Sequence, residues 1–330
     1  MIRIGHSTIG SEHSTYIIAE AGINHNGNMK IAKKMITTAA KCGANAIKFQ
    51  TIIPEELFSS KSWFEMSKNW MLTKDQHIEL KKFAKKNKIE FFSTPFGQKS
   101  IKILRDVGVK LVKISSGDLN NFELIKDVIK MKIPIIISTG MGNISEINEV
   151  VKFLKKRRCK FVLLHCNSSY PTPLKDTNLK TIPFFQKKFN SLVGYSDHTM
   201  GIEACLGAVS LGSCVIEKHF TLDKNMDGPD QKLSSDPSEF KHLVKKIRLI
   251  EQMQGIERID TTNSEKKFKL FLRKSIHASR DLSKGSIIKK SDLSLVRPGN
   301  GIPPTKLSMV IGKKLRYNIK KGQLLKMNIF

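Results

Sequence analysis

The 330-residue chain has few of the features that mark particular protein classes. Its five cysteines are an odd number and form no CxxC pair, which argues against a disulfide framework and a zinc knuckle. No run of about 18 or more apolar residues occurs, and the opening MIRIGHSTIG lacks the basic-then-apolar layout of a signal peptide. These absences predict a soluble, cytoplasmic protein with no membrane-spanning segment.

Acidic residues are also scarce, since 29 Asp and Glu stand against 57 Lys and Arg, a formal net charge of +28. Such a charge favours nucleic acid as a partner. The lysines, however, are dispersed through helix-like stretches such as KKFAKKNK (81–88), and aromatic residues are not interleaved with them as a base-stacking surface requires. We therefore expect solvated helix faces and no nucleic-acid binding, which a salt-dependent gel shift would test.

Short apolar runs rich in β-branched residues alternate with longer amphipathic stretches through most of the chain, the pattern of repeated βα units. Eight such runs predict an α/β fold, a (β/α)8 TIM barrel. The predicted strands are 15–20, 45–50, 89–94, 111–116, 134–139, 160–166, 191–196 and 213–220.

Three segments follow from this pattern. Residues 1–253 form the predicted barrel, which ends with the amphipathic stretch PSEFKHLVKKIRLIEQM (237–253). The polar residues after it favour a linker over 254–272. From 273 to 330 short apolar runs alternate with Gly and Pro turns, which predicts a small separate C-terminal domain.

Two lysines interrupt apolar strands, Lys48 in AIKFQ and Lys113 in LVKIS. Catalytic residues of barrel enzymes lie at the carboxyl ends of the strands, and lysine is rarely buried without a partner. Together with strand-end Ser and Thr hydroxyls, the two ammonium groups could bind the phosphate and carboxylate of a small substrate. The alternative is that both lysines reach the rim or neutralise structural carboxylates.

Two histidines, His198 and His219, come directly after or at the end of the seventh and eighth predicted strands. Neighbouring strands would bring both imidazoles to one mouth, where they suit a divalent ion with open coordination positions. Each could instead be an ordinary hydrogen-bonding histidine.

Glu20 closes the first predicted strand and precedes the loop AGINHNG (21–27). A carboxylate there could orient or deprotonate a sugar hydroxyl. It could equally be a structural partner of Lys48 on the next strand.

The motifs IIAEAGINHNG, AIKFQT, STPF, KISSGD, STGM, SSYPTP, GYSDHT, IEKHFTLD, GPD and RPGNG occur in order along the chain. In these motifs the chain resembles the bacterial sialic acid synthases. The resemblance covers nearly the whole sequence. It implies a TIM barrel followed by an antifreeze-like (SAF) domain, and a homodimer in which that domain covers the partner's barrel.

The resemblance also implies a set of site residues. His198 and His219 would hold the metal, Mn²⁺ or Mg²⁺. Phosphoenolpyruvate would contact Lys48, Thr94, Lys113, Ser116, Ser168 and Ser196, with Glu217 nearby as a catalytic group. The sugar would face Glu20, Gln50, Tyr170, Asp230 and Phe271, together with Arg297 of the other protomer.

The implied activity is N-acetylneuraminate synthase, which condenses phosphoenolpyruvate with N-acetylmannosamine and water and releases phosphate. A legionaminic acid synthase, or a synthase using another N-acetylated aminosugar, is the alternative. Pseudaminic acid synthesis is disfavoured by MDGPD and SSGDLNN, and we assign no role to 57–76.

Two other functions remain to be compared. Barrels that condense phosphoenolpyruvate with a sugar phosphate lack the RPGNG-bearing domain that this chain carries. A non-catalytic carbohydrate-binding protein would be expected to have lost the strand-end lysines or the histidine pair, and both are present.

Overall fold

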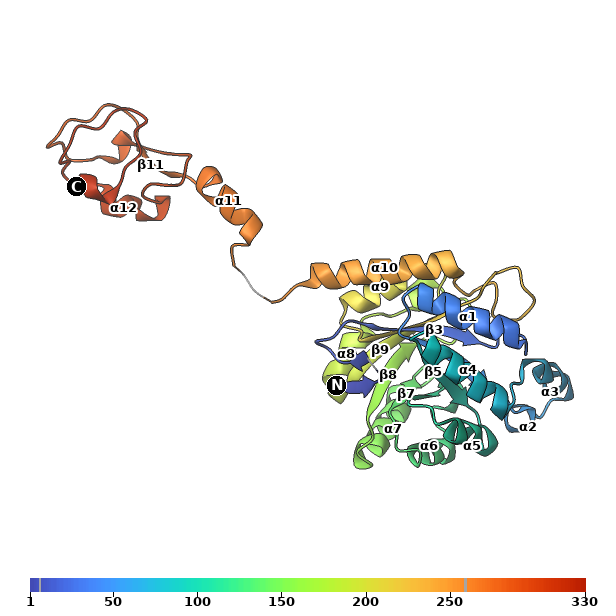
Figure 1. Ribbon diagram of the computed structural model, residues 1–330. Helices are drawn as coiled ribbons and strands as arrows, with labels where there is room; N and C mark the ends of the chain where they lie inside the picture. Colours follow the sequence, from blue (N-terminus) through green and yellow to red (C-terminus); the bar gives the residue numbers. More distant parts are fainter. Residues whose placement is uncertain (6, 258–259) are drawn as a thin grey trace. The chain divides into compact units, whose positions relative to one another are not determined.

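The computed structural model describes residues 1–5, 7–257 and 260–330. The chain divides into two compact units, Met1–Gly255 and Ile256–Phe330, each considered by itself (Figure 1). Within the described residues no helix is both long and apolar enough to cross a membrane.

The first unit is a closed barrel of eight parallel strands, so the predicted TIM barrel is confirmed. The ring closes between the last strand and the first of the eight, β10 and β3. The strands are β3 (Tyr16–Gly22), β4 (Ala46–Thr51), β5 (Glu90–Pro95), β6 (Val112–Ile114), β7 (Ile135–Ser138), β8 (Phe161–Cys166), β9 (Leu192–Asp197) and β10 (Val215–His219).

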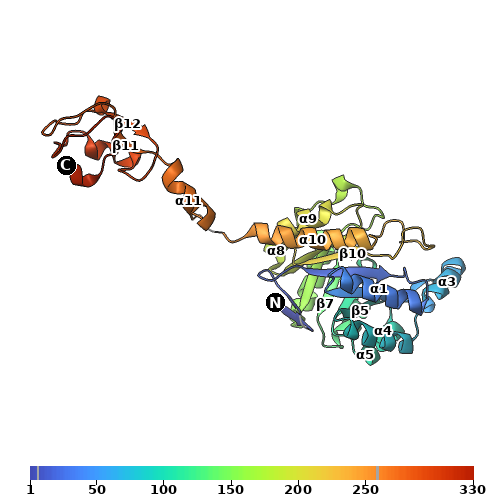
Figure 2. The same ribbon diagram turned by 45° about the horizontal axis from the view of Figure 1, so that its top comes forward.

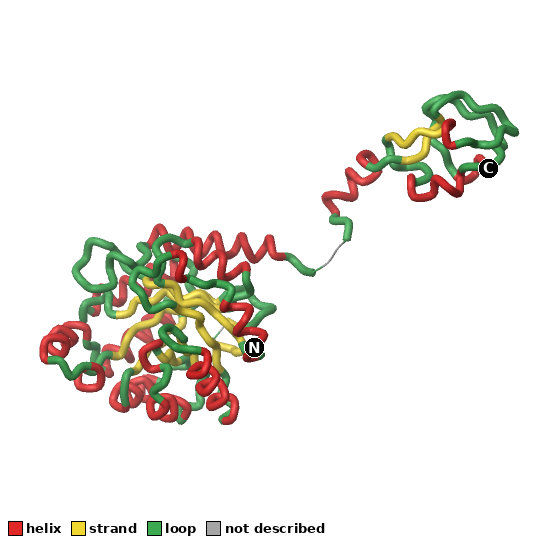
Figure 3. Tube along the Cα trace, turned by 180° about the vertical axis from the view of Figure 1, so that it is seen from behind, coloured by secondary structure: helices red, strands yellow, loops and turns green. Residues whose placement is uncertain are grey.

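Helices surround the strands, as the tube view shows (Figure 3). They form because apolar residues recur on one face; in α1 this face buries Ala32, Met35, Ile36 and Ala39. The large helices are α1 (Met29–Lys41), α4 (Lys74–Lys86), α5 (Gln98–Val107), α6 (Phe122–Ile129), α7 (Ile144–Lys156), α8 (Thr181–Phe189), α9 (Glu203–Ser210) and α10 (Pro237–Gln254). The segment without an assigned role contains α3 (Lys61–Ser67).

Alternation along each strand separates two apolar layers. One set of side chains packs between the strands and the helices, and the other fills the barrel interior. The interior layer also includes Ile2, Ile4 and Ile9 of an antiparallel hairpin, β1 (Ile2–Ile4) and β2 (Ser7–Ile9), which the sequence analysis missed. This hairpin contacts strand starts such as Tyr16 and Val215, so it closes the amino-terminal end of the barrel.

The second unit has its own small core, which includes Ile276, Leu282 and Val310. It contains the antiparallel pair β11 (Ser275–Ala278) and β12 (Leu293–Val296) and the short helix α12 (Leu307–Val310). Figure 2 shows this pair within the unit.

The predicted linker, 254–272, contains a helix that the sequence analysis did not predict, α11 (Asn263–Leu272). Thr262 and Glu265 form a capping box at its start, a signal present in TNSE. Residues 258–259 of the linker lie outside the described residues.

Candidate active site

A pocket of about 390 Å³ opens at the carboxyl ends of the barrel strands. Twelve of the predicted site residues line it: Glu20, Lys48, Gln50, Thr94, Lys113, Ser116, Ser168, Tyr170, Ser196, His198, Glu217 and His219. The fold therefore brings together residues that lie almost 200 positions apart in the sequence.

The remaining three predicted residues lie elsewhere. Asp230 lies beside the pocket, with its Oδ2 3.7 Å from Nδ1 of His219. Phe271 and Arg297 belong to the second unit, where Arg297 donates from Nε to the Leu272 carbonyl at 2.8 Å and Phe271 is exposed.

Two buried lysines and two buried carboxylates form the charged floor of the pocket. Lys113 Nζ lies 2.7 Å from Glu217 Oε1, and Lys48 Nζ lies 2.9 Å from Glu20 Oε1. Lys48 also approaches Glu217 Oε2 at 3.7 Å, which joins the two pairs into one network. The pairing of Glu20 with Lys48 thus exists, and it lies inside the pocket.

In this network the pKa values of the two carboxyl groups are shifted in opposite directions. Burial alone would raise the pKa of Glu217, but Lys113 and Lys48 outweigh it and hold that pKa at about 2. Burial raises the pKa of Glu20 to about 7, because Lys48 offsets only part of the desolvation. At neutral pH Glu217 is ionised, whereas Glu20 can either hold or release a proton.

Hydroxyl groups line the wall next to the lysines. Ser196 donates to Glu217 Oε1 at 2.9 Å, and the Gly140 N–H donates to Ser116 Oγ at 3.0 Å. A Cβ on Gly140 would lie 2.3 Å from Ser168 Oγ, so this close approach requires glycine. The arrangement offers several donors to a small anion.

Ser138 also lines this wall, and the sequence analysis did not assign it to the site. Its Oγ is buried and has no hydrogen-bond partner among the described residues. Its position at the end of β7 was the available signal. Other lining residues absent from the prediction are Leu57, Phe96, Ser115, Gly117, Met141 and Cys166.

The two candidate metal ligands lie next to each other at the mouth, at the ends of the paired strands β9 and β10, with ring centroids 5.4 Å apart. His198 Nδ1 lies 2.6 Å from the Asn167 carbonyl, so this nitrogen carries the proton and Nε2 keeps its lone pair. Burial lowers the pKa of His198 to about 4. Burial, reinforced by His198, lowers the pKa of His219 well below its usual value.

Both imidazoles are therefore neutral at pH 7, the form that binds metal. His219 Nδ1 and one oxygen each of Glu20 and Glu217 are buried without a hydrogen-bond partner among the described residues. These donor types fit a divalent ion whose other positions are filled by water or substrate. No group of three or more His, Cys, Asp or Glu suited to a metal occurs in the part of the chain that the structure describes.

Tyr170 lies beside the two histidines, with its ring centroid 4.0 Å from that of His198 and 5.7 Å from that of His219. Gln50 Nε2 lies 3.5 Å from Glu20 Oε1. Gly22 lies beside these groups at φ +50°, a backbone conformation that favours glycine, and a Cβ there would make ordinary contacts of 3.4 Å with Glu20 Oε1 and 3.7 Å with Asp230 Oδ2. Polar groups and an aromatic face at one rim are suited to a sugar.

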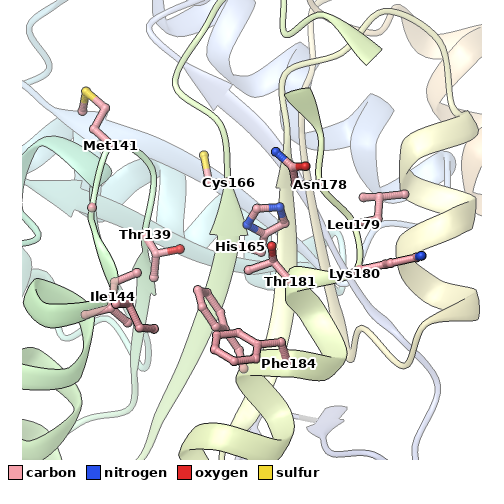
Figure 4. A pocket seen from close by; sticks show the side chains of 13 residues that line it. Thr139, Met141, Ile144, His165, Cys166, Asn178, Leu179, Lys180, Thr181 and Phe184 are labelled. Atoms are coloured by element: carbon pink, nitrogen blue, oxygen red, sulfur yellow. The ribbon is translucent and has the colours of Figure 1, made fainter. Parts of the chain in front are cut away.

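A larger cavity, about 600 Å³, lies between β8 and α8 (Figure 4). It shares Met141 and Cys166 with the site, but most of its lining is apolar, including Ile144, Leu179 and Phe184. It contains none of the paired charges, so we place the chemistry in the smaller pocket.

Comparison with known proteins decides the family. A model described as the NeuB family matches residues 35–258, and a SAF domain model matches residues 273–328. The chain belongs to the NeuB family. The resemblance found in the sequence is thereby confirmed, as is the TIM barrel followed by a SAF domain.

NeuB relatives match over almost their full length. The N,N'-diacetyllegionaminic acid synthase of Campylobacter jejuni is 41% identical, over 94% of this chain and 99% of the relative. The human N-acetylneuraminate-9-phosphate synthase is 33% identical, over 95% of this chain and 92% of the relative. These relatives show that the chain is an enzyme, a synthase, as predicted.

A solved structure is also similar. The sialic acid synthetase of Leptospira borgpetersenii, crystallised with citrate, superposes with a TM-score of 0.78 at 37% identity, covering 81% of this chain and 94% of that chain.

Proposed function

We propose that this NeuB-family chain condenses phosphoenolpyruvate with an N-acetylated aminosugar and water, giving a nonulosonic acid and phosphate. The observation that carries the proposal is the single pocket in which two buried lysines, a row of hydroxyls and two neutral imidazoles converge. The lysines and hydroxyls suit a small substrate with two anionic groups, a phosphate and a carboxylate, and the polar rim suits a sugar.

Phosphoenolpyruvate would lie over the charged floor. Lys113 and the hydroxyls of Ser116 and Ser196 would bind its phosphate, and Lys48 with Thr94, 3.2 Å apart, would bind its carboxylate. The ammonium groups stabilise the negative charge that builds up on the phosphate as its C–O bond breaks.

The sugar would lie at the rim formed by Gln50, Tyr170 and Asp230, with its open-chain aldehyde toward the histidines. His198 and His219 would hold Mn²⁺ or Mg²⁺, which when bound supplies Lewis acidity at the aldehyde oxygen. Carbon 3 of phosphoenolpyruvate attacks the aldehyde carbon, water adds to carbon 2, and phosphate leaves. Glu20, with its pKa near 7, is placed to move a proton at the reacting oxygen.

The identity of the sugar can be narrowed. The sequence resemblance placed N-acetylmannosamine first, but two N,N'-diacetyllegionaminic acid synthases are 41% and 40% identical, against 33% for the human neuraminate-9-phosphate synthase. We therefore favour the diacetamido sugar that yields N,N'-diacetyllegionaminic acid. N-Acetylmannosamine remains the second candidate, supported by the 37% identity to the sialic acid synthetase.

We also propose that the enzyme works in the cytoplasm as a domain-exchanged homodimer, in which Arg297 and Phe271 serve the partner's barrel. Exposed apolar side chains on α11, among them Phe268, Leu270 and Phe271, support a surface that a partner covers.

The proposal is tested by incubating the purified protein with phosphoenolpyruvate, Mn²⁺ and each aminosugar, and identifying the product by mass. We expect a nonulosonic acid and one phosphate per turnover. Chelator should stop the reaction, and Mn²⁺ should restore it in the wild type and not in His198→Ala. Phosphate release without a sugar adduct, or full activity of a metal-stripped His198→Ala, would contradict the proposal.

A further inference from the structure

A further buried ion pair, separate from those in the pocket, lies behind the histidines, on the face of the strands that is turned away from the pocket. Lys218 Nζ is 2.5 Å from Asp197 Oδ2, and the two residues are 3% and 1% exposed. They occupy opposed positions in the β9–β10 ladder, the last pair before the two strands end. Because side chains alternate along a strand, the neighbours of this pair point into the barrel.

The carboxylate of Asp197 is fully satisfied. Besides Lys218, it accepts hydrogen bonds from Tyr195 Oη at 3.2 Å, the Thr199 N–H at 2.9 Å and Cys205 Sγ at 3.1 Å. Four donors match the lone-pair capacity of a carboxylate. Such a network leaves Asp197 a single position.

The pair fixes the backbone next to His198, through the residue before it and the residue after it. Asp197 precedes His198 and accepts from the N–H of Thr199, while Lys218 donates to the carbonyl of Thr199 at 2.9 Å. Both peptide groups of the residue after His198 are therefore tied to the ion pair. On the neighbouring strand Lys218 directly precedes His219.

Folding stability alone does not explain why this ion pair is buried here, because a well-packed apolar pair of similar size would stabilise the fold as well or better. Its position is more informative. It holds together the ends of two strands from which two imidazoles project, with ring centroids 5.4 Å apart.

We propose that Asp197 and Lys218 are positioning residues that set the separation and orientation of His198 and His219, and so the affinity of the divalent-metal site. This inference rests on the proposed metal role of the two histidines. Neither Asp197 nor Lys218 lines the pocket, so they act only through the residues they hold.

The test is a titration of the metal-stripped protein with Mn²⁺ alone, in which electron paramagnetic resonance measures how much Mn²⁺ is bound. We expect Asp197→Asn and Lys218→Met each to weaken Mn²⁺ binding by about 10- to 100-fold, the usual effect of removing groups that orient metal ligands. Phosphoenolpyruvate affinity, measured by calorimetry without metal, should stay within about twofold, since the phosphate-binding groups are untouched. The double variant should lose little more Mn²⁺ affinity than either single variant, because each single variant already breaks the same ion pair.

Glu251→Gln is the matched control. Glu251 pairs with Arg248 at 2.8 Å and accepts from the Thr15 N–H at 2.6 Å, where β3 begins, away from the mouth. It should lower the melting temperature and leave Mn²⁺ affinity unchanged. Should Asp197→Asn fail to fold, Tyr195→Phe and Cys205→Ala each remove one hydrogen bond from the same carboxylate and should weaken Mn²⁺ binding in smaller steps.

The outcomes separate this inference from the function itself. If wild type binds Mn²⁺, His198→Ala does not, and the Asp197 and Lys218 variants bind as wild type, the positioning role is wrong and the metal site stands. Loss of affinity that merely follows melting temperature, with Glu251→Gln equally affected, also overturns the positioning role. If wild type itself binds no Mn²⁺, the metal site falls and this inference with it.

Discussion

Glu20 and Glu217 are the same residue type in one pocket, yet their pKa values shift in opposite directions. Glu217 lies close to two ammonium groups, whereas Glu20 has one close partner and the Glu217 charge nearby. The result is one permanently charged carboxylate and one that exchanges its proton near neutral pH, a division that suits acid–base chemistry.

Replacing Glu20 with Gln should change how stability depends on pH. The folded pKa is raised from 4.5 to about 7, so Glu20's contribution to stability is complete below about pH 4.5 and is lost as pH rises through about 7. Glu20→Gln should match wild type at about pH 4 and exceed it at about pH 8 by up to about 3 kcal/mol. Chemical unfolding at both pH values measures this, with the exposed Glu149→Gln as control; an equal gap at both would contradict the pKa of Glu20.

Replacing Lys113 with Met keeps the apolar stem and deletes the charge. Because hydrogen bonds to charged groups contribute about 1.5–3 kcal/mol, we expect the KM for phosphoenolpyruvate to rise about 10- to 100-fold, with the sugar KM much less affected. Lys48→Met should behave alike, and the exposed Lys102→Met should not. Unchanged phosphoenolpyruvate kinetics in both variants would return the two lysines to a structural role.

At the scale of elements, the two ends of the barrel have different roles: one end contributes to stability and the other holds the candidate active site. The hairpin β1–β2 packs apolar side chains into the amino-terminal end, and the charged network lies at the carboxyl ends. Substitutions at one end should therefore leave the other largely intact.

Ile9→Ala tests this separation. Ile9 is fully buried in the interior layer, and its truncation should cost about 2–5 kcal/mol and lower the melting temperature by several degrees. At 25 °C, well below the usual melting range of about 45–65 °C, kcat and both KM values should stay near wild type. Arg3→Ala, at an exposed position of β1, is the control. A selective loss of phosphoenolpyruvate binding in Ile9→Ala would show that the hairpin reaches the site.

At the scale of the whole molecule, domain exchange makes a sharp prediction. Glu20→Ala and Arg297→Ala should each be inactive as homodimers. In a heterodimer of the two chains, exchange creates one site with both groups intact and one with neither, so activity should reappear. Differently tagged chains, purified as heterodimers and assayed for product, provide the measurement. Heterodimers as inactive as their parents would show that each C-terminal domain serves its own barrel.

Much of the site could be predicted from the sequence, because the carboxyl ends of the strands in a barrel lie close together in space. Lys48, Lys113, His198 and His219 were selected for their strand-end positions, and the structure places all four in one pocket. Ser138 was not assigned to the site, since a hydroxyl without a partner can be recognised only once its surroundings are known.

The sequence by itself determined the order of strands, their inward and outward faces and the residue types at the mouth, because these depend on local periodicity and chain order. Only the tertiary structure decided which groups pair and how their pKa values shift. Lys113 and Glu217 are 104 positions apart yet joined at 2.7 Å, and Asp197 and Lys218 meet on the hidden face of the same strands. Desolvation and Coulomb interaction depend on distance through space, which the linear sequence does not contain.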